Sequence, residues 1–301
     1  MENQREDAYL GKALKFIREK KGISSKDFAK SMKLSSTKLS KIENGQQMLS
    51  ADSLIRALSF LNIYYEEFIL LLDTEDSFKA RVETKNDFER LINQGSAQYA
   101  QTMLAKAQEN RKAYKDSYFQ HIYCILNSQL IFDTTHDFET TRSALEPIRE
   151  YLSSIESWFE YEIALFANCY CLFPIEDAIK LGNEALTKMK DYSTSTKYNE
   201  ISHNLFLGLA TYALSDANFY DYAINFADKA FSSAAAKPMY TALMTHIIKQ
   251  IAYYKKQSLH YSKSQLVNII EGLELMGFDE YAHFVLDLLQ KHGITLENVE
   301  K

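Results

Sequence analysis

Two short segments with helical patterns, separated by a tight corner, constrain the fold of this chain more than any other feature. Ser24 stands before one of these segments and Ser35 stands before the other. Serine is a preferred N-cap because its hydroxyl accepts a hydrogen bond from a backbone N–H in the first helical turn. Gly45 is a typical stop for the second helix. The apolar faces consist of Phe28, Ala29, Met32, Leu39 and Ile42.

Residues on both sides of this unit predict three more short helices. Before it, an apolar stripe with helical spacing runs through Leu10, Leu14 and Ile17. After it, Ser50 is a candidate cap for a fourth helix, and residues 64–72 predict a fifth. The apolar positions of the fourth helix are Leu54, Leu58 and Leu61. Five short helices in about 70 residues indicate a small domain with the outline of a DNA-reading helix-turn-helix.

At these residues the chain resembles the phage-repressor class of DNA-binding domains, the XRE or lambda-repressor-like type. The matching words are Gly-Ile-Ser at 22–24, Ala29, and Leu-Ser-Lys-Ile-Glu-Asn-Gly at 39–45. The family usually has Gln at the start of its second helix, where this chain has Ser25, whose side chain is shorter. The resemblance also implies an internal ion pair between Arg18 and Glu43, which we interpret as structural.

In this geometry the first side chains of the second motif helix face base edges, while flanking groups bind phosphates. Lys41 is the candidate with the most sequence information, because lysine can donate to guanine O6 and N7. The alternatives are helix capping for the hydroxyl residues and a solvated surface charge for the lysines. The candidates are Ser36, Thr37 and Lys41 for bases, Lys38 for a base or a phosphate, and Ser25, Lys26, Asn44 and Gln46 for the backbone.

Composition extends the helical prediction to the whole chain and divides it by charge. Only nine Gly and three Pro in 301 residues indicate an all-α protein with short connections. Residues 1–65 hold twelve Lys or Arg against seven Asp or Glu, a net charge of about +5, which leaves about -11 for the remainder. Positive charge suits phosphate neutralisation. Nucleic acid is therefore expected to meet the N-terminal domain.

Several classes of site are disfavoured. The cysteines, Cys124, Cys169 and Cys171, form no CxxC pair and do not stand at zinc-ligand spacing with His, so they are expected to be small core residues. The seven His are scattered singly, and no phosphate-binding Gly-rich loop or HExxH motif occurs. We expect no metal, no cofactor and no enzyme activity. Without a signal peptide or an apolar run of about 18 residues, a cytoplasmic protein with no membrane partner is expected.

The acidic part of the chain predicts a second, helical domain. We expect the DNA-binding domain at 1–73, a linker at 74–83 and the second domain at 84–301. From the third span on, helix pairs recur about every 40 residues, which favours a tetratricopeptide (TPR)-like, right-handed helical repeat with a concave inner surface. The expected helices are 84–93, 96–110, 113–133, 137–153, 156–172, 175–190, 196–215, 218–233, 238–257, 262–276 and 278–291.

The expected inner helices, 113–133, 156–172, 196–215 and 238–257, carry many tyrosines, which suit a binding groove or act as wedges between helices. Behind an XRE-type head, the segment 154–169 (Ser-Ile-Glu-Ser-Trp-Phe-Glu-Tyr-Glu-Ile-Ala-Leu-Phe-Ala-Asn-Cys) resembles the Rgg/GadR/MutR regulators of Gram-positive bacteria. This resemblance implies a homodimer whose C-terminal repeats bind a short signalling peptide, as in quorum sensing.

Five residues of the expected inner surface are candidates for binding that peptide. Asn168 and Asn204 each carry an amide that can donate to and accept from a peptide backbone, or that caps and bridges helices instead. Cys171 lies one turn from Asn168, where the resemblance suggests a basic residue in relatives. Tyr161 and Tyr212 are the aromatic candidates.

Two functions follow from these observations. The first is a transcriptional regulator that binds a palindromic promoter site in double-stranded DNA as a homodimer and responds to a signalling peptide. The alternative is a ligand-independent regulator whose helical body only dimerises or contacts RNA polymerase. The last helices form either the dimer contact or a cap, and their apolar residues are Leu266, Ile269, Ile270, Leu273 and Leu275.

Overall fold

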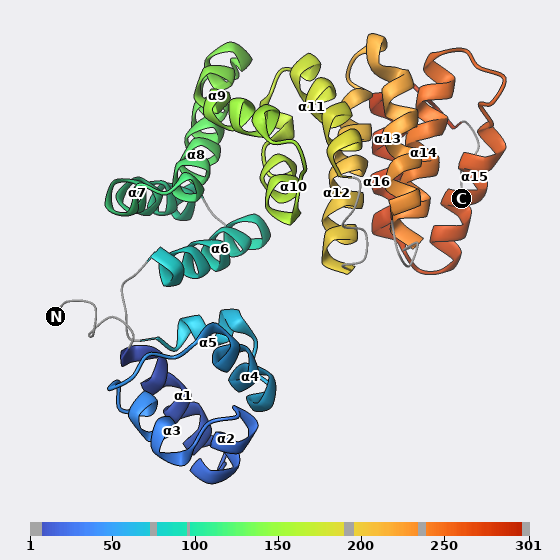
Figure 1. Cartoon of the computed structure of the whole chain (residues 1–301). Helices are drawn as coiled ribbons and strands as arrows, with labels where there is room; N and C mark the ends of the chain where they lie inside the picture. The colour runs from blue at the N-terminus through green and yellow to red at the C-terminus, as the bar shows by residue number, and fades with distance from the viewer. Residues whose placement is uncertain (1–7, 73–76, 95–96, 190–195, 234–238, 297–301) are drawn as a thin grey trace. The chain divides into compact units, whose positions relative to one another are not determined.

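A computed structural model of the chain describes residues 8–72, 77–94, 97–189, 196–233 and 239–296. These residues form helices and connecting turns, without a β-strand, so the all-α prediction is confirmed (Figure 1). The chain divides into two compact units, residues 1–123 and 124–301, and the division falls inside a helix.

The first unit begins with five short helices around one apolar core (Figure 1). The predicted caps are confirmed, because Ser24, Ser35 and Ser50 each accept a hydrogen bond from a backbone N–H in the first turn of the following helix. Gly45 has a positive φ of 70° after the third helix, as expected for a helix stop. The helices are α1 (Ala8–Lys20), α2 (Ser25–Ser31), α3 (Ser36–Glu43), α4 (Ala51–Leu61) and α5 (Tyr65–Leu70).

Longer helices complete the first unit: α6 (Ser77–Gln94), α7 (Ala97–Tyr114) and the first turns of α8 (Ser117–Thr135). Residues 77–83 of the expected linker therefore belong to a helix, while 73–76 lie outside the described residues. The reason is a buried stripe, because Ala80, Thr84 and Phe88 recur every four residues and pack inward.

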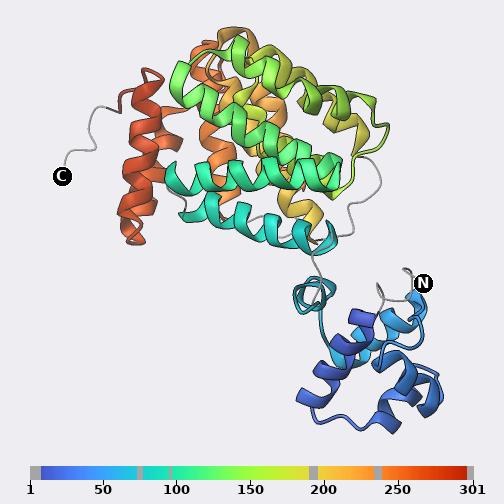
Figure 2. The same cartoon turned by 90° about the vertical axis from the view of Figure 1, so that its left-hand side faces the viewer.

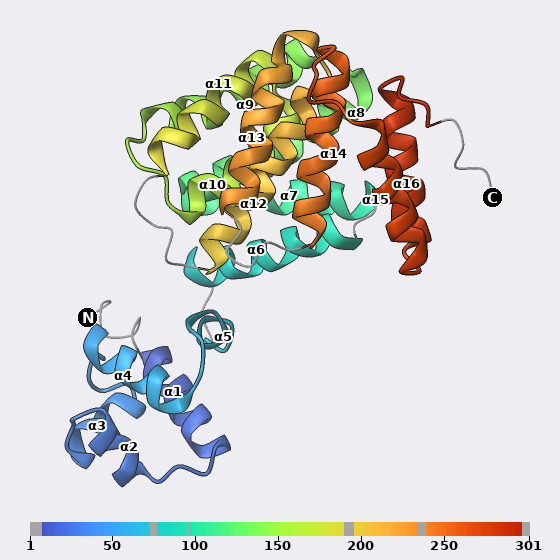
Figure 3. The same cartoon turned by 90° about the vertical axis from the view of Figure 1, so that its right-hand side faces the viewer.

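The second unit is a stack of helices in two layers. Contacts join α10, α12 and α14 in one layer and α9 and α11 in the other, while α13 packs between α12 and α14. Figures 1 and 3 show α12, α13 and α14 running side by side. The elements are α9 (Phe138–Ser154), α10 (Glu160–Ala167), η1 (Tyr170–Leu172), α11 (Ile175–Lys188), α12 (Thr196–Ala213), η2 (Ala217–Phe219), α13 (Tyr220–Ser233), α14 (Met239–Lys255), α15 (Lys263–Leu275) and α16 (Asp279–Lys291).

The prediction of one continuous helix over 156–172 is wrong. α10 covers only Glu160–Ala167 and is followed by the short 3-10 helix η1. Upstream, the Trp158 N–H donates to the carbonyl of Lys188 at 3.0 Å, which keeps this residue out of the helix. Downstream, the amide of Asn168 donates to the carbonyl of Ala164 at 2.7 Å and caps the end of α10.

Helices α15 and α16 lie at the C-terminal end of the second unit (Figure 2). Three of the apolar residues expected to offer contact surface, Leu266, Ile270 and Leu273, are instead buried within the unit. Leu275 remains 90% exposed. The exposed apolar surface here comes mainly from residues that follow it, namely Met276, Phe278, Tyr281 and Phe284.

Candidate DNA-contact surface and candidate ligand face

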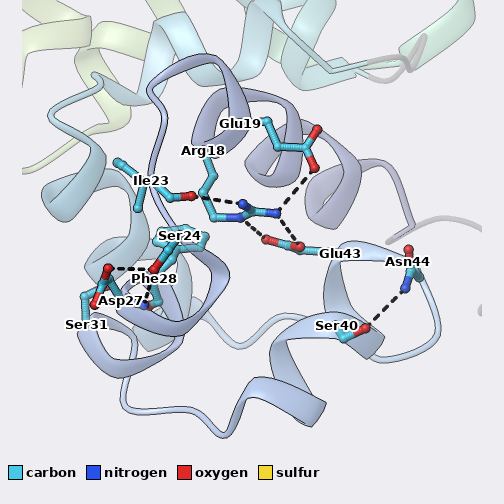
Figure 4. Close-up of polar contacts among 10 residues, drawn as sticks. All are labelled: Arg18, Glu19, Ile23, Ser24, Asp27, Phe28, Ser31, Ser40, Glu43 and Asn44. Carbon is cyan, nitrogen blue, oxygen red and sulfur yellow. Dashed lines mark hydrogen bonds and ion pairs between the residues drawn. The ribbon is translucent and has the colours of Figure 1, made fainter.

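The helix-turn-helix is formed by α2, α3 and the turn between them. Ser24 accepts a hydrogen bond from the Asp27 N–H at 3.1 Å, and its hydroxyl donates to the Asp27 carboxylate at 2.6 Å (Figure 4). Ser35 accepts from the Lys38 N–H at 3.2 Å. Lys33 takes the left-handed conformation, with a φ of 55°, in the turn between the helices. Local hydrogen bonds therefore define where α3 begins.

The predicted base-contacting residues all lie on the solvent side of α3. Leu39 and Ile42 face the core, whereas Lys38 and Lys41 are exposed, as are Ser36 and Thr37 at the start of the helix. This division follows from the helical period, which separates an inner face from an outer one. The outer face presents hydroxyl and ammonium groups, the donors that base edges and phosphates accept.

The predicted backbone contacts surround this face. Lys26, Asn44 and Gln46 are exposed, and Ser25 is half-buried as the first residue of α2. The amide of Asn44 points back to the hydroxyl of Ser40 at 3.4 Å (Figure 4). The structure thus brings the eight DNA-binding candidates onto α2, α3 and the turn after α3.

A buried ion pair supports α3 from its inner side. The Arg18 Nε donates to Glu43 Oε1 at 2.7 Å and its Nη2 donates to Oε2 at 3.0 Å, while Nη1 donates to the carbonyl of Ile23 at 3.0 Å (Figure 4). The hydrogen bond to Glu43 raises the pKa of Arg18. This geometry ties α1, the turn before α2 and the end of α3 together, so the predicted contact between Arg18 and Glu43 is present.

Gly11 of α1 is a supporting residue that the sequence analysis did not single out. A Cβ at this position would overlap the Ile42 carbonyl oxygen and lie only 2.7 Å from the carbonyl carbon. The backbones of α1 and α3 therefore approach at a distance that only glycine permits. A glycine inside an otherwise helical pattern was the available signal.

The ligand-binding candidates of the second unit fall into two groups. Tyr212 donates its hydroxyl to the Phe173 carbonyl at 2.9 Å, and its ring lies 6.2 Å from that of Tyr170. Cys171, next to Tyr170, is exposed, which corrects the expectation that all three cysteines are core residues. Tyr161 belongs elsewhere, because its ring contacts Tyr151 of α9 at 6.2 Å.

The two asparagines differ in availability. Asn168 is half-buried and already donates to the backbone of its own helix, so its capping alternative describes that hydrogen bond. Asn204 is exposed on α12, and its amide makes no hydrogen bond in the described part of the chain. Of the two, Asn204 has both amide groups available to a ligand.

The segment that carries the body resemblance is largely structural. Trp158 is fully buried, and its indole N–H donates to the Leu152 carbonyl at 3.1 Å. The Lys188 ammonium lies 5.9 Å from the centre of the Trp158 ring and donates to the same carbonyl at 3.0 Å. Glu162 is also buried and accepts from the Tyr151 hydroxyl at 2.6 Å. These contacts join α9, α10 and α11.

Models of known protein families match both the helix-turn-helix region and the helical body of the chain. A model of the helix-turn-helix domain matches residues 11–73. The C-terminal domain of the HTH-type transcriptional regulator Rgg matches residues 101–285, which is more than half of the chain. The chain belongs to the Rgg family. It is accordingly a DNA-binding transcriptional regulator and not an enzyme.

Solved structures with the same fold cover nearly all of this Rgg-family chain. The Streptococcus dysgalactiae SHP pheromone receptor Rgg2 is similar at a TM-score of 0.64 and 18% identity, covering 94% of this chain and 99% of that one. A putative transcriptional regulator from Listeria monocytogenes EGD-e gives 0.70 and 16%, with 96% and 100% covered. PrgX in its complex with cCF10 gives 0.62 and 14%, with 95% and 92% covered. At these identities the likeness concerns the fold.

Two further observations concern the described residues of this Rgg-family chain. The described residues contain no group of three His, Cys, Asp or Glu placed to hold a metal ion. Within the same residues, no helix combines the length and the apolar character needed to cross a membrane.

Proposed function

We propose that this Rgg-family regulator binds a palindromic site in double-stranded DNA as a homodimer and that a short signalling peptide controls this binding. The exposed outer face of α3 supports the DNA contact, because its hydroxyl and ammonium groups stand on a helix held from behind by Arg18 and Glu43. The similar proteins include a pheromone receptor, Rgg2, and PrgX bound to cCF10, which supports a peptide as the ligand class.

The observation that carries the peptide proposal is the exposed stripe of α12. Asn204 and Thr211 are exposed on this helix, and Gly208 lies half-buried between them. Residues three and four apart share one helix face, so they form one uncharged polar surface beside α10 and α14. Such a surface suits a peptide backbone, which needs donors and acceptors rather than charges. A peptide acts on transcription only if it binds two states of the regulator with unequal affinity.

The exposed apolar end of the second unit supports the homodimer. Leu275 is 90% exposed, Met276 56% and Tyr281 48%. A terminal repeat normally presents a polar outer face to water. An apolar outer face is therefore expected to be covered by a binding partner. A second copy of the same surface suits a two-fold symmetric dimer, the symmetry that a palindromic DNA site requires.

The proposal is tested with the full chain and labelled duplex fragments from its own genome. Fragments that the protein retains are titrated by fluorescence anisotropy at two salt concentrations, with and without synthetic candidate peptides. We expect salt-sensitive binding whose affinity changes when a peptide binds. Binding that no peptide alters, with no peptide bound to the protein, would instead favour the ligand-independent regulator, whose body dimerises or contacts RNA polymerase.

A further inference from the structure

The end of the Tyr170 side chain packs against α12 at residue 208. There is room for it in this position because residue 208 is glycine and has no Cβ. A Cβ built on Gly208 would overlap the Tyr170 hydroxyl oxygen and would lie 2.7 Å from Cζ and 3.0 Å from Cε1 of the ring. Distances under 3.0 Å are not compatible with a real side chain at this position unless the ring moves. The end of the Tyr170 side chain therefore lies directly on the α12 backbone.

The hydroxyl of Tyr170 is not engaged by other described residues of the fold. Across the described residues it makes no hydrogen bond, whereas the neighbouring Tyr212 hydroxyl donates to the Phe173 carbonyl at 2.9 Å. Tyr212 therefore fixes the segment after α10, and Tyr170 keeps a free donor and acceptor. Burial raises the pKa of Tyr170 to about 12, so the hydroxyl keeps its proton at neutral pH.

A second unused polar group stands one turn away. Asn204 lies four residues before Gly208, on the same side of α12, and its exposed amide also makes no hydrogen bond in the part of the chain that the structure describes. Side chains at this spacing are roughly 5–6 Å apart at Cβ. An extended peptide presents backbone groups on one side about every 6.8 Å, since each residue advances about 3.4 Å. The two groups thus lie within about one repeat of an extended peptide, so neighbouring backbone groups of one ligand can reach both.

The charged groups near this pair are acidic, because Glu176 acts on Tyr212 and Glu200 is exposed four residues before Asn204 on α12. Besides burial, the Cys171 thiol raises the pKa of Tyr170. Cys171, Glu176 and Tyr170 raise the pKa of Tyr212 in the same way. A peptide carboxylate placed here would be repelled by Glu176 and Glu200, so this surface favours a stretch of ligand without acidic side chains.

We infer that Tyr170, packed on Gly208, and Asn204 together bind the backbone of a stretch of the signalling peptide without acidic side chains, with Gly208 as the residue that positions Tyr170. This inference rests on the proposed peptide-receptor function and adds the residues and the ligand chemistry to it. Gly208 acts through Tyr170 and is a positioning residue.

The test starts from a peptide ligand selected on the protein itself. Randomised eight-residue synthetic peptides are selected on the full-length chain, and the tightest binder is measured by calorimetry against four variants. Tyr170→Phe and Asn204→Ala should each weaken binding roughly 3- to 12-fold, the usual range for one hydrogen bond. Gly208→Ala should weaken it at least as much, because the new methyl group displaces Tyr170. Gly272→Ala is the matched control, since a Cβ there meets nothing within 4 Å.

A change in the peptide distinguishes a direct hydrogen bond from a general change of the surface. Each backbone amide of the selected peptide is replaced in turn by an ester, which removes one donor and weakens one acceptor. At one position the ester should weaken binding to the wild-type protein but not to Tyr170→Phe, and at a nearby position the same should hold for Asn204→Ala. Melting temperatures of all variants show whether they are folded.

The possible outcomes separate the two levels of the proposal. If no peptide from the library binds the folded wild-type protein, the receptor function fails and this inference fails with it. If a peptide binds with equal affinity to wild type, Tyr170→Phe and Gly208→Ala, the receptor function stands and the assignment of Tyr170 and Gly208 is overturned. A selected peptide with Asp or Glu at the two ester-sensitive positions would overturn the assignment of a ligand stretch without acidic side chains.

Discussion

At the scale of single residues, Lys41 is the side chain that we propose contributes most to the reading of DNA sequence. It lies exposed on α3, one residue before the buried Ile42 and two before Glu43 of the ion pair. Its neighbours on the inner face hold the helix, while its own ammonium has no partner within the described chain. On this proposal, DNA binding and folding depend on different residues of the same helix.

Replacing Lys41 should weaken operator binding without unfolding the domain. We expect Lys41→Ala to cost roughly 1–3 kcal/mol with the selected operator and to relax the preference for one base. Anisotropy titrations on the operator and on single-base variants measure both effects. Lys180→Ala, which removes an exposed charge of the same sign from α11, is the control. An equal loss on every duplex would assign Lys41 to a phosphate, and no loss at all would contradict the docking.

Arg18 and Glu43 should behave in the opposite way. Arg18→Met leaves the buried Glu43 carboxylate without its partner, so we expect a loss of roughly 3–5 kcal/mol in the free energy of unfolding. The double variant Arg18→Met with Glu43→Leu should recover much of this, because no unpaired charge remains. Urea unfolding of the three proteins measures the difference. A double variant as unstable as Arg18→Met would show that the bond to Ile23, not the pair, is decisive.

At the scale of elements, the close approach of α1 and α3 gives a second prediction. Gly11→Ala must separate the two helices, and overpacking of this kind costs roughly 1–3 kcal/mol, which outweighs the gain of up to about 1 kcal/mol from replacing a helical glycine. Gly272→Ala in α15 has open space around it and should show only the gain. Thermal unfolding compares them, and a Gly11→Ala protein as stable as Gly272→Ala would exclude the tight contact.

Elements defined by local signals could be predicted from the sequence. Ser24, Ser35 and Ser50 cap the helices that follow them because the hydroxyl and the N–H it accepts from lie three residues apart. The break before α10 could not be predicted in this way. It depends on the Trp158 N–H and the Lys188 carbonyl, which lie thirty residues apart and meet only after α11 has packed.

The candidate sites follow the same division. The outer face of α3 is a matter of helical period, so Lys38 and Lys41 could be predicted to be exposed. The contact of Arg18 with Glu43 was implied by the family resemblance alone. Gly208 and Gly11 were missed, because the need for glycine arises from a neighbour that is distant in sequence, Tyr170 in one case and Ile42 in the other.

At the scale of the whole molecule, the exposed end of α15 and α16 predicts the oligomeric state. Leu275→Asp should weaken the dimer by about 30-fold or more, because the association would bury an unpaired charge. Leu275 is 90% exposed, so the folding of the monomer should not change. Leu259→Asp, at a leucine that is fully exposed elsewhere in the same unit, is the control. Sedimentation velocity over a range of concentrations measures both variants, and a Leu275→Asp protein that dimerises like wild type would place the interface elsewhere.

The residues that hold α3 in place and the residues that it exposes to solvent lie on opposite sides of the helix. This arrangement has a consequence for how such a regulator changes its targets. Arg18, Glu43 and Gly11 hold the helix from the side turned away from solvent, and none of them is among the side chains offered to a duplex. The outward positions Ser36, Thr37, Lys38 and Lys41 can therefore be exchanged as a set at little thermodynamic expense. Under the proposed docking, retargeting the protein to a new promoter, by evolution or by engineering, changes these outward positions and leaves the scaffold untouched.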